Sequence, residues 1–126
     1  MKLNNIRKQA GLTLIEVTLV IAVLLGLISV LFVGISAYKE GSDRAKCILN
    51  ITNVQKAVRS YQNMYEGTIG GTLLIATITG PGNMLETAPV CPNGGAYTSE
   101  ITYPVVGTAY LTCDRAGHVP ASTSGW

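Results

Sequence analysis

Three cysteines and one histidine are the residues of this 126-residue chain whose side chains most readily do chemistry: Cys47, Cys91, Cys113 and His118. Thiols either pair as disulfides or bind metal ions, but these cysteines lie too far apart to form the C-x-x-C pairs of common zinc sites. The spacing therefore predicts no metal site. The odd number of cysteines leaves at least one thiol outside any disulfide within the chain. A single histidine near the tail is interpreted as structural or solvent-facing.

No constellation of residues indicates an enzyme. The sequence has no G-x-S-x-G element, no P-loop and no G-x-G-x-x-G fingerprint. Glu100 and Asp114 are the only acidic residues near the tail, too few to predict a calcium site. We therefore expect no catalytic residue, no cofactor and no bound metal.

The net charge of +2 comes from the first residues of the chain. Lys2, Arg7 and Lys8 precede a long apolar stretch, and the rest of the chain has six basic and seven acidic residues. Because no basic patch with interleaved aromatic residues occurs in that remainder, the sequence does not predict a nucleic-acid partner.

Glu16 is a charged residue inside the apolar stretch. After it, residues 17–38 form a run of 22 residues without charge or proline. A transmembrane helix needs about 20 such residues, and the basic residues ahead of the run predict a cytoplasmic N-terminus. A carboxylate at the bilayer centre costs about 2.5–3.5 kcal/mol, and less near a helix end, so we expect Glu16 to have a partner.

Residues 8–17, K-Q-A-G-L-T-L-I-E-V, resemble the N-terminal signature of type IV prepilins and pseudopilins. The resemblance implies that a prepilin peptidase cuts after Gly11 on the cytoplasmic side and methylates the new first residue, Leu12. It also implies that Glu16 pairs with the α-amine of Leu12 in a neighbouring subunit, so that the subunits polymerise through this helix. In a plain membrane anchor, Glu16 would instead extend to the lipid headgroups.

Residues 39–66 are predicted to continue the helix in amphipathic form. Apolar residues recur at steps of three and four, which is the period of one helix face. These residues are Cys47, Ile51, Val54, Val58, Tyr61 and Tyr65. Gly67 is predicted to follow the end of the helix, and Cys47 is interpreted as a small buried hydrophobe.

Residues 89–126 have the pattern of a small β-region. Two β-prone runs, 96–101 and 108–113, are joined by a loop with proline and glycine, which predicts an antiparallel ribbon packed on the helix. The pattern of residues 68–88 does not decide between a buried strand and a helical turn. The sequence thus predicts an α+β, pilin-like fold, in which a long N-terminal helix packs on a small antiparallel β-sheet.

The tail carries a second resemblance. Residues 91–97, C-P-N-G-G-A-Y, followed by Cys113 and His118, are similar to the end of a pseudopilin subgroup with a C-P-x-G-G-x-Y element. Cys91 and Cys113 bracket the predicted ribbon, and a disulfide between them would close a 23-residue loop. Such a closure stabilises by about 3 kcal/mol in the chain-entropy model. The alternative is a disulfide from Cys47 to Cys91 or to Cys113, which the sequence does not exclude.

The predicted organisation is a cleaved basic leader (residues 1–11), a transmembrane and assembly helix (12–38) and a periplasmic head (39–126). The resemblance implies a subunit of a type IV pilus or of a type II secretion pseudopilus, anchored in the bacterial inner membrane before assembly into a fibre in the periplasm or at the cell surface. The implied partners are further copies of the chain, related minor pilins, the prepilin peptidase, an inner-membrane assembly platform and membrane lipid. The alternative is a bitopic, membrane-anchored binding module that is neither cleaved nor polymerised.

Overall fold

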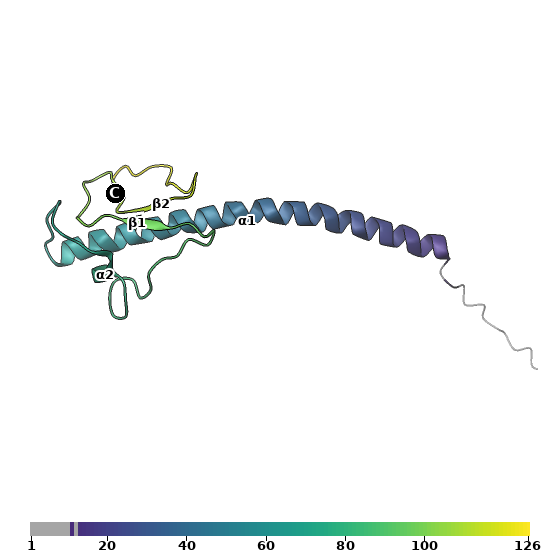
Figure 1. Cartoon of the computed structure of the whole chain (residues 1–126), viewed down its shortest axis with the longest axis horizontal. Coiled ribbons are helices and arrows are strands. Elements are labelled where there is room, and N and C mark those ends of the chain that lie inside the picture. The colour runs from purple at the N-terminus through teal and green to yellow at the C-terminus, as the bar shows by residue number, and fades with distance from the viewer. Residues whose placement is uncertain (1–10, 12) are drawn as a thin grey trace, which may run out of the picture. The chain divides into compact units, whose positions relative to one another are not determined.

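The computed structural model describes Gly11 and residues 13–126; the other residues of the predicted leader and Leu12 lie outside the described residues. Its elements, in chain order, are α1 (Leu14–Met64), α2 (Ile75–Ile78), β1 (Tyr97–Ser99) and β2 (Leu111–Cys113) (Figure 1). The chain divides into two compact units, Met1–Ala37 and Tyr38–Trp126. The helix α1 begins in the first unit and ends in the second.

The part of α1 in the first unit is uncovered. Every side chain described from Thr13 to Ala37 is exposed, including Phe32 at 67% and Val33 at 75%. By its length and composition, α1 is the one described helix that could cross a membrane. A helix that is apolar all round is stable when lipid or other apolar helices surround it.

The polar side chains within this apolar segment bond to their own helix. The hydroxyls of Thr18, Ser29 and Ser36 donate to backbone carbonyls three or four residues earlier, over 2.8–3.1 Å. Since hydrocarbon offers no hydrogen-bond partner, such internal bonds lower the cost of placing a hydroxyl there.

The second half of α1 forms one wall of the core of the second unit. The predicted apolar stripe provides this wall through Cys47, Ile51, Val54 and Val58. Tyr61 packs at the edge of the core, whereas Tyr65, which the stripe also included, is 64% exposed. Tyr65 follows the last residue of α1, so the buried helix face has ended there. Its ring lies against that of Tyr61, with centroids 4.4 Å apart.

The end of α1 differs from the prediction by two residues: the helix ends at Met64, not at Glu66. Glu66 has a φ of 51°, and the amide of Gly67 donates to the carbonyl of Gln62 over 2.9 Å. This is the hydrogen bond of a Schellman motif, whose left-handed position is here taken by a glutamate. Gly67 is needed for a different reason, because a Cβ there would lie 2.5 Å from Cζ of Tyr103.

The strands β1 and β2 form the predicted small antiparallel sheet. Tyr97 lies opposite Cys113 and Ser99 lies opposite Leu111. Each strand has three residues, and one further backbone bond at each end, of 2.9 and 3.1 Å, extends the pairing. The two strands lie alongside the second half of α1 (Figure 1). Leu111 and Tyr110 are buried against the helix stripe, which gives the two-stranded sheet a core.

The segment that the sequence left undecided contains an isolated β-bridge and a helical turn, but no strand. Thr72 pairs with Thr102 in an antiparallel bridge, and the amide of Leu73 donates to the carbonyl of Ile101 over 2.9 Å. The helical turn α2 follows, and Leu73 and Ile78 are both buried in the core. Beyond α2 the chain turns back through a bond from the amide of Leu85 to the carbonyl of Ile78, also 2.9 Å long.

Candidate functional site

The predicted cleavage site lies at the start of the described chain. Gly11 is exposed, and among the described residues no atom lies within 4 Å of the position that a Cβ would take there. The adjacent Leu12, predicted as the methylated residue, lies outside the described residues. Cleavage and methylation therefore stay predictions.

Glu16, the predicted assembly residue, is the third residue of α1. Its Oε2 accepts hydrogen bonds from the backbone amide and the hydroxyl of Thr13, at 3.4 and 3.5 Å. In return, the amide of Glu16 donates to the Thr13 hydroxyl over 3.3 Å. This reciprocal arrangement is a capping box, which satisfies free amides at the helix start and places a negative charge at the positive end of the helix dipole. Glu16 thus has a partner within its own chain, and the T-x-x-E spacing that signals it was readable in the sequence.

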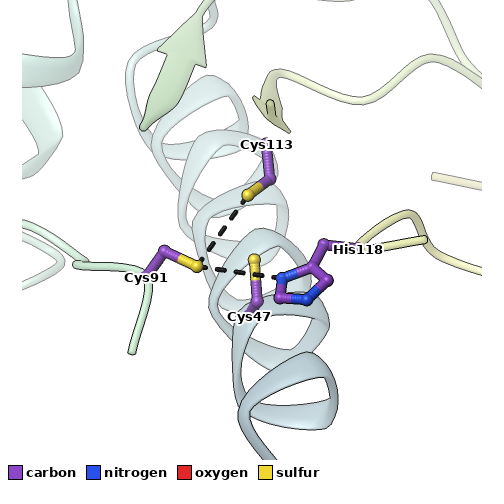
Figure 2. Close-up of side chains that lie close together, drawn as sticks. All are labelled: Cys47, Cys91, Cys113 and His118. Carbon is purple, nitrogen blue, oxygen red and sulfur yellow. Dashed lines mark hydrogen bonds between the residues drawn. The ribbon is translucent and has the colours of Figure 1, made fainter. Parts of the chain in front are cut away.

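A second constellation lies in the second unit, where three thiols and an imidazole converge (Figure 2). One ligand atom from each of Cys47, Cys91, Cys113 and His118 lies within 4.8 Å of all the others. The sulfur of Cys91 is 3.9 Å from that of Cys113 and 3.8 Å from Nδ1 of His118. Cys47, Cys91 and His118 are buried, with at most 4% of each residue exposed.

Each member of this Cys/His cluster comes from a different part of the second unit. Cys47 projects from the buried stripe of α1, Cys91 precedes β1, and Cys113 is the last residue of β2. His118 is returned to the core by a turn in which its amide donates to the carbonyl of Arg115 over 3.1 Å.

Gly95 is what allows the tail to approach Cys91 so closely. A Cβ at this position would lie 2.9 Å from the sulfur of Cys113 and 2.8 Å from Cγ of Arg115. Because real Cβ atoms do not come so near to other heavy atoms, only glycine fits here without a shift of the Cys113 side chain.

The surroundings of Cys91 favour its thiolate. Burial acts to raise the pKa of the thiol, but backbone amides of Asn93 and Gly95 donate to the sulfur, and contacts with His118 and Cys47 act in the same direction as these amides. The net effect lowers the pKa of Cys91 to about 7. The thiolate is the form that attacks disulfides and binds metals.

Cys47 is held in the opposite state. Burial raises the pKa of its thiol to about 12, so in the absence of a cation this side chain stays neutral. The hydroxyl of Tyr97 lies beside it and donates to the backbone carbonyl of Cys47 over 3.4 Å. Asn50, on the next turn of α1, donates to that hydroxyl over 3.2 Å and to the carbonyl of Val90 over 3.1 Å. These bonds fix the residue preceding Cys91 against the helix.

The predicted Cys91–Cys113 disulfide joins two residues that the fold places side by side. Their sulfurs are 3.9 Å apart and all three cysteines are free thiols in the structure, whereas a disulfide bond is about 2.05 Å long. The disulfide stays a prediction.

The sequence reasoning treated Cys47 and His118 as separate structural residues, and the structure brings both to the Cys91–Cys113 pair. The signal that was available is the position of Cys47 on the apolar stripe, which pointed it toward the predicted ribbon. Asp114, which was considered as a calcium ligand, accepts a hydrogen bond from the backbone amide of Ala96 over 2.8 Å.

No protein-family model, no curated protein and no solved structure matches this chain.

Proposed function

We propose that this chain is the structural subunit of a pilus-like or pseudopilus fibre, cut after Gly11 and polymerised through the first part of α1. The observation that carries the proposal is the surface of that helix. From residue 17 to residue 38 it bears no charge, and within the first unit no described side chain is covered by protein. Such a surface needs an apolar environment, which lipid provides before assembly and other copies of the same helix provide in a fibre.

The position of Glu16 supports assembly through this helix. Cleavage after Gly11 would create an α-amine at Leu12, four residues before the carboxylate. In a low-dielectric bundle of helices, an amine and a carboxylate from neighbouring subunits are each costly alone and much less costly as a pair. Since the other contacts between apolar helices have little directionality, such a pair would set the axial register of the fibre.

A second candidate function is a membrane-anchored binding module. The capping box favours it, because Thr13 gives Glu16 a role that requires neither cleavage nor a second subunit. In this case α1 only tethers the second unit, and the chain remains a full-length monomer.

The first experiment measures the intact mass and N-terminal sequence of the chain extracted from membranes. We expect a chain that begins at Leu12 and carries one added methyl group. A chain that still begins at Met1 would overturn the proposed processing and leave the anchored module as the better explanation. A Gly11→Ala variant should remain uncut, because a side chain at this position is expected to block the peptidase.

The second experiment separates the two roles of Glu16. Glutamine preserves a capping box but carries no charge, whereas alanine removes both functions. If Glu16 pairs with an amine, Glu16→Gln and Glu16→Ala should both be cut, insert in the membrane and form few fibres. If capping is its only role, Glu16→Gln should assemble normally. Glu40→Gln, at an exposed position on the same helix, is the matched control and should form fibres as the parent does.

A further inference from the structure

We propose that Cys47, Cys91, Cys113 and His118 form a closed Cys₃His site for a single structural zinc ion. The site lies entirely within the second unit, so it does not depend on processing or fibre assembly. It goes beyond the proposed function by assigning a metal to the head of the subunit.

The distances between the ligand atoms fit tetrahedral zinc. With Zn–S bonds of about 2.3 Å and Zn–N bonds of about 2.0–2.1 Å, the edges of the tetrahedron measure about 3.5–3.8 Å. The Cys91 sulfur is 3.9 Å from the Cys113 sulfur and 3.8 Å from Nδ1 of His118. No ligand atom is farther than 4.8 Å from another, so closure requires shifts of about 1 Å or less. This space accommodates one ion and is too small for an iron–sulfur cluster.

The number and chemistry of the ligands also favour zinc over a disulfide. A disulfide between two of the thiols would leave the third thiol and the imidazole of His118 as buried neighbours of the bond. A zinc ion uses all four groups, and three thiolates with one imidazole are a standard ligand set of structural zinc sites. Soft sulfur ligands in tetrahedral geometry select zinc over magnesium or calcium.

The groups behind the ligands match those of a metal site. The amide of Gly94 donates to the carbonyl of Cys91 over 3.2 Å, which fixes the turn that follows this ligand. Asn50 holds the segment before Cys91 against α1 through its bond to Val90. Gly95 leaves the space that the Cys113 sulfur occupies.

Zinc at this position would connect four segments that are far apart in the sequence. Residues 47, 91, 113 and 118 belong to α1, to the turn before β1, to the end of β2 and to the tail. The sheet between them has only three residues in each strand. Because metal binding to a folded site adds to the free energy of folding, the ion would hold this small sheet on the helix.

The test uses the full-length chain, solubilised in detergent and never exposed to a reducing agent. The metal content is measured by elemental mass spectrometry after desalting, and thiols are counted by alkylation after denaturation in a chelator. We expect about one zinc ion per chain and three reactive thiols. A chain without zinc and with a single reactive thiol contains a disulfide, and that result would overturn the proposal. Three thiols without zinc, in a chain that also fails to retain added Zn²⁺, would overturn it as well.

Variants then identify the ligands. His118→Ala and Cys47→Ser should each weaken Zn²⁺ binding by more than about 10-fold, since even outer-sphere changes at zinc sites cost that much. Val119→Ala, next to His118 but 62% exposed, is the control and should bind as the parent does. Equal binding by all three variants would indicate adventitious zinc and contradict the assignment.

Spectroscopy of the parent chain provides a readout that does not depend on the folding of variants. Co²⁺ alone, added to the chelator-treated chain, should produce sulfur-to-cobalt charge-transfer absorption and the intense d–d bands of a tetrahedral site. Weak bands of octahedral cobalt without charge transfer would overturn the proposal.

Discussion

The side chain of Gln55 on α1 is hydrogen-bonded to the backbone of Tyr110, whose amide donates to Oε1 of Gln55 over 2.8 Å. The same side chain donates from Nε2 to the carbonyl of Thr108 over 3.2 Å. Gln55 is 4% exposed and Tyr110 is fully buried. The side-chain amide of Gln55 therefore makes the hydrogen bonds that the backbone of a neighbouring strand would make with the residues just before β2.

Replacing Gln55 by leucine should destabilise the second unit. The change leaves the buried amide of Tyr110 and the carbonyl of Thr108 without their partners, at a cost of about 2–4 kcal/mol in the free energy of unfolding. Urea unfolding of the detergent-solubilised chain, followed by the near-ultraviolet circular dichroism of its tyrosines, measures this loss. The Tyr110 amide should also exchange with solvent faster.

Gln62→Leu is the matched control, because Gln62 is only half-buried and accepts one side-chain hydrogen bond, from Arg59 at 2.8 Å. Its cost should stay below about 1.5 kcal/mol. Similar losses of stability in both variants would show that the two hydrogen bonds from the Gln55 side chain to the backbone of Thr108 and Tyr110 do not contribute more than an ordinary surface hydrogen bond.

The second unit should also lose stability at alkaline pH. Burial raises the pKa of Tyr103 and Tyr110 above the ordinary value of 10.0, and Tyr97 is shifted in the same direction, mainly by burial. The folded state thus favours the neutral phenols, whereas the unfolded chain releases these protons near its ordinary pKa. This contribution to stability is complete below about pH 10 and is lost as the pH rises above it.

Urea unfolding at about pH 8 and about pH 11 checks this expectation. Tyr110→Phe should lower stability at the lower pH, because the bond from the Tyr110 hydroxyl to the carbonyl of Leu73, 2.8 Å long, is lost. The same variant should show a smaller decrease between the two pH values than the parent. Tyr65→Phe, at an exposed position, should change neither quantity. An equal decrease in all three proteins would contradict a role for Tyr110.

Local patterns in the sequence predicted the long helix and the antiparallel strand pair, but not the side-chain contacts between distant parts of the chain. The steps of three and four residues from Cys47 to Val58 predicted the buried helix face, and the β-prone runs predicted the antiparallel pair. Both predictions rest on patterns among residues that are close together in the sequence. The partners of Gln55 could not be predicted in this way, because they are backbone groups more than fifty residues away.

The Cys/His cluster was missed for a related reason. Zinc motifs are recognised by short spacings, but here every ligand comes from a different segment. Their convergence depends on the register of β1 and β2 and on the turn before His118, which tertiary packing determines. In contrast, the capping box of Thr13 and Glu16 follows a local T-x-x-E pattern, which the sequence contains although the capping box was not predicted from it.

Glu66→Gly should stabilise the second unit. Glu66 has a φ of 51°, where a residue with a Cβ is strained by about 1–2 kcal/mol and glycine is not. This gain is partly offset, because glycine has more conformational entropy in the unfolded chain. We therefore expect a net increase of about 0.5–1 kcal/mol in the free energy of unfolding. The same urea titration measures it.

Glu86→Gly is the matched control, since Glu86 is exposed and does not have a positive φ. The same chemical change there should leave stability unchanged or lower it. A loss of stability in Glu66→Gly would mean that contacts of the Glu66 side chain outweigh the strain of its backbone.

Gly95→Ala should disturb the Cys/His cluster while leaving all four proposed ligands in place. The new Cβ would lie 2.9 Å from the Cys113 sulfur and 3.0 Å from Oδ1 of Asp114, so these side chains have to shift away from residue 95. We expect a loss of about 1–3 kcal/mol in stability from overpacking and weaker retention of zinc. Gly41→Ala is the control, because among the described residues its Cβ meets no atom within 4 Å outside its own helix backbone, and alanine favours the helix. If Gly95→Ala binds zinc as tightly as the parent, zinc retention does not depend on the present position of the Cys113 sulfur.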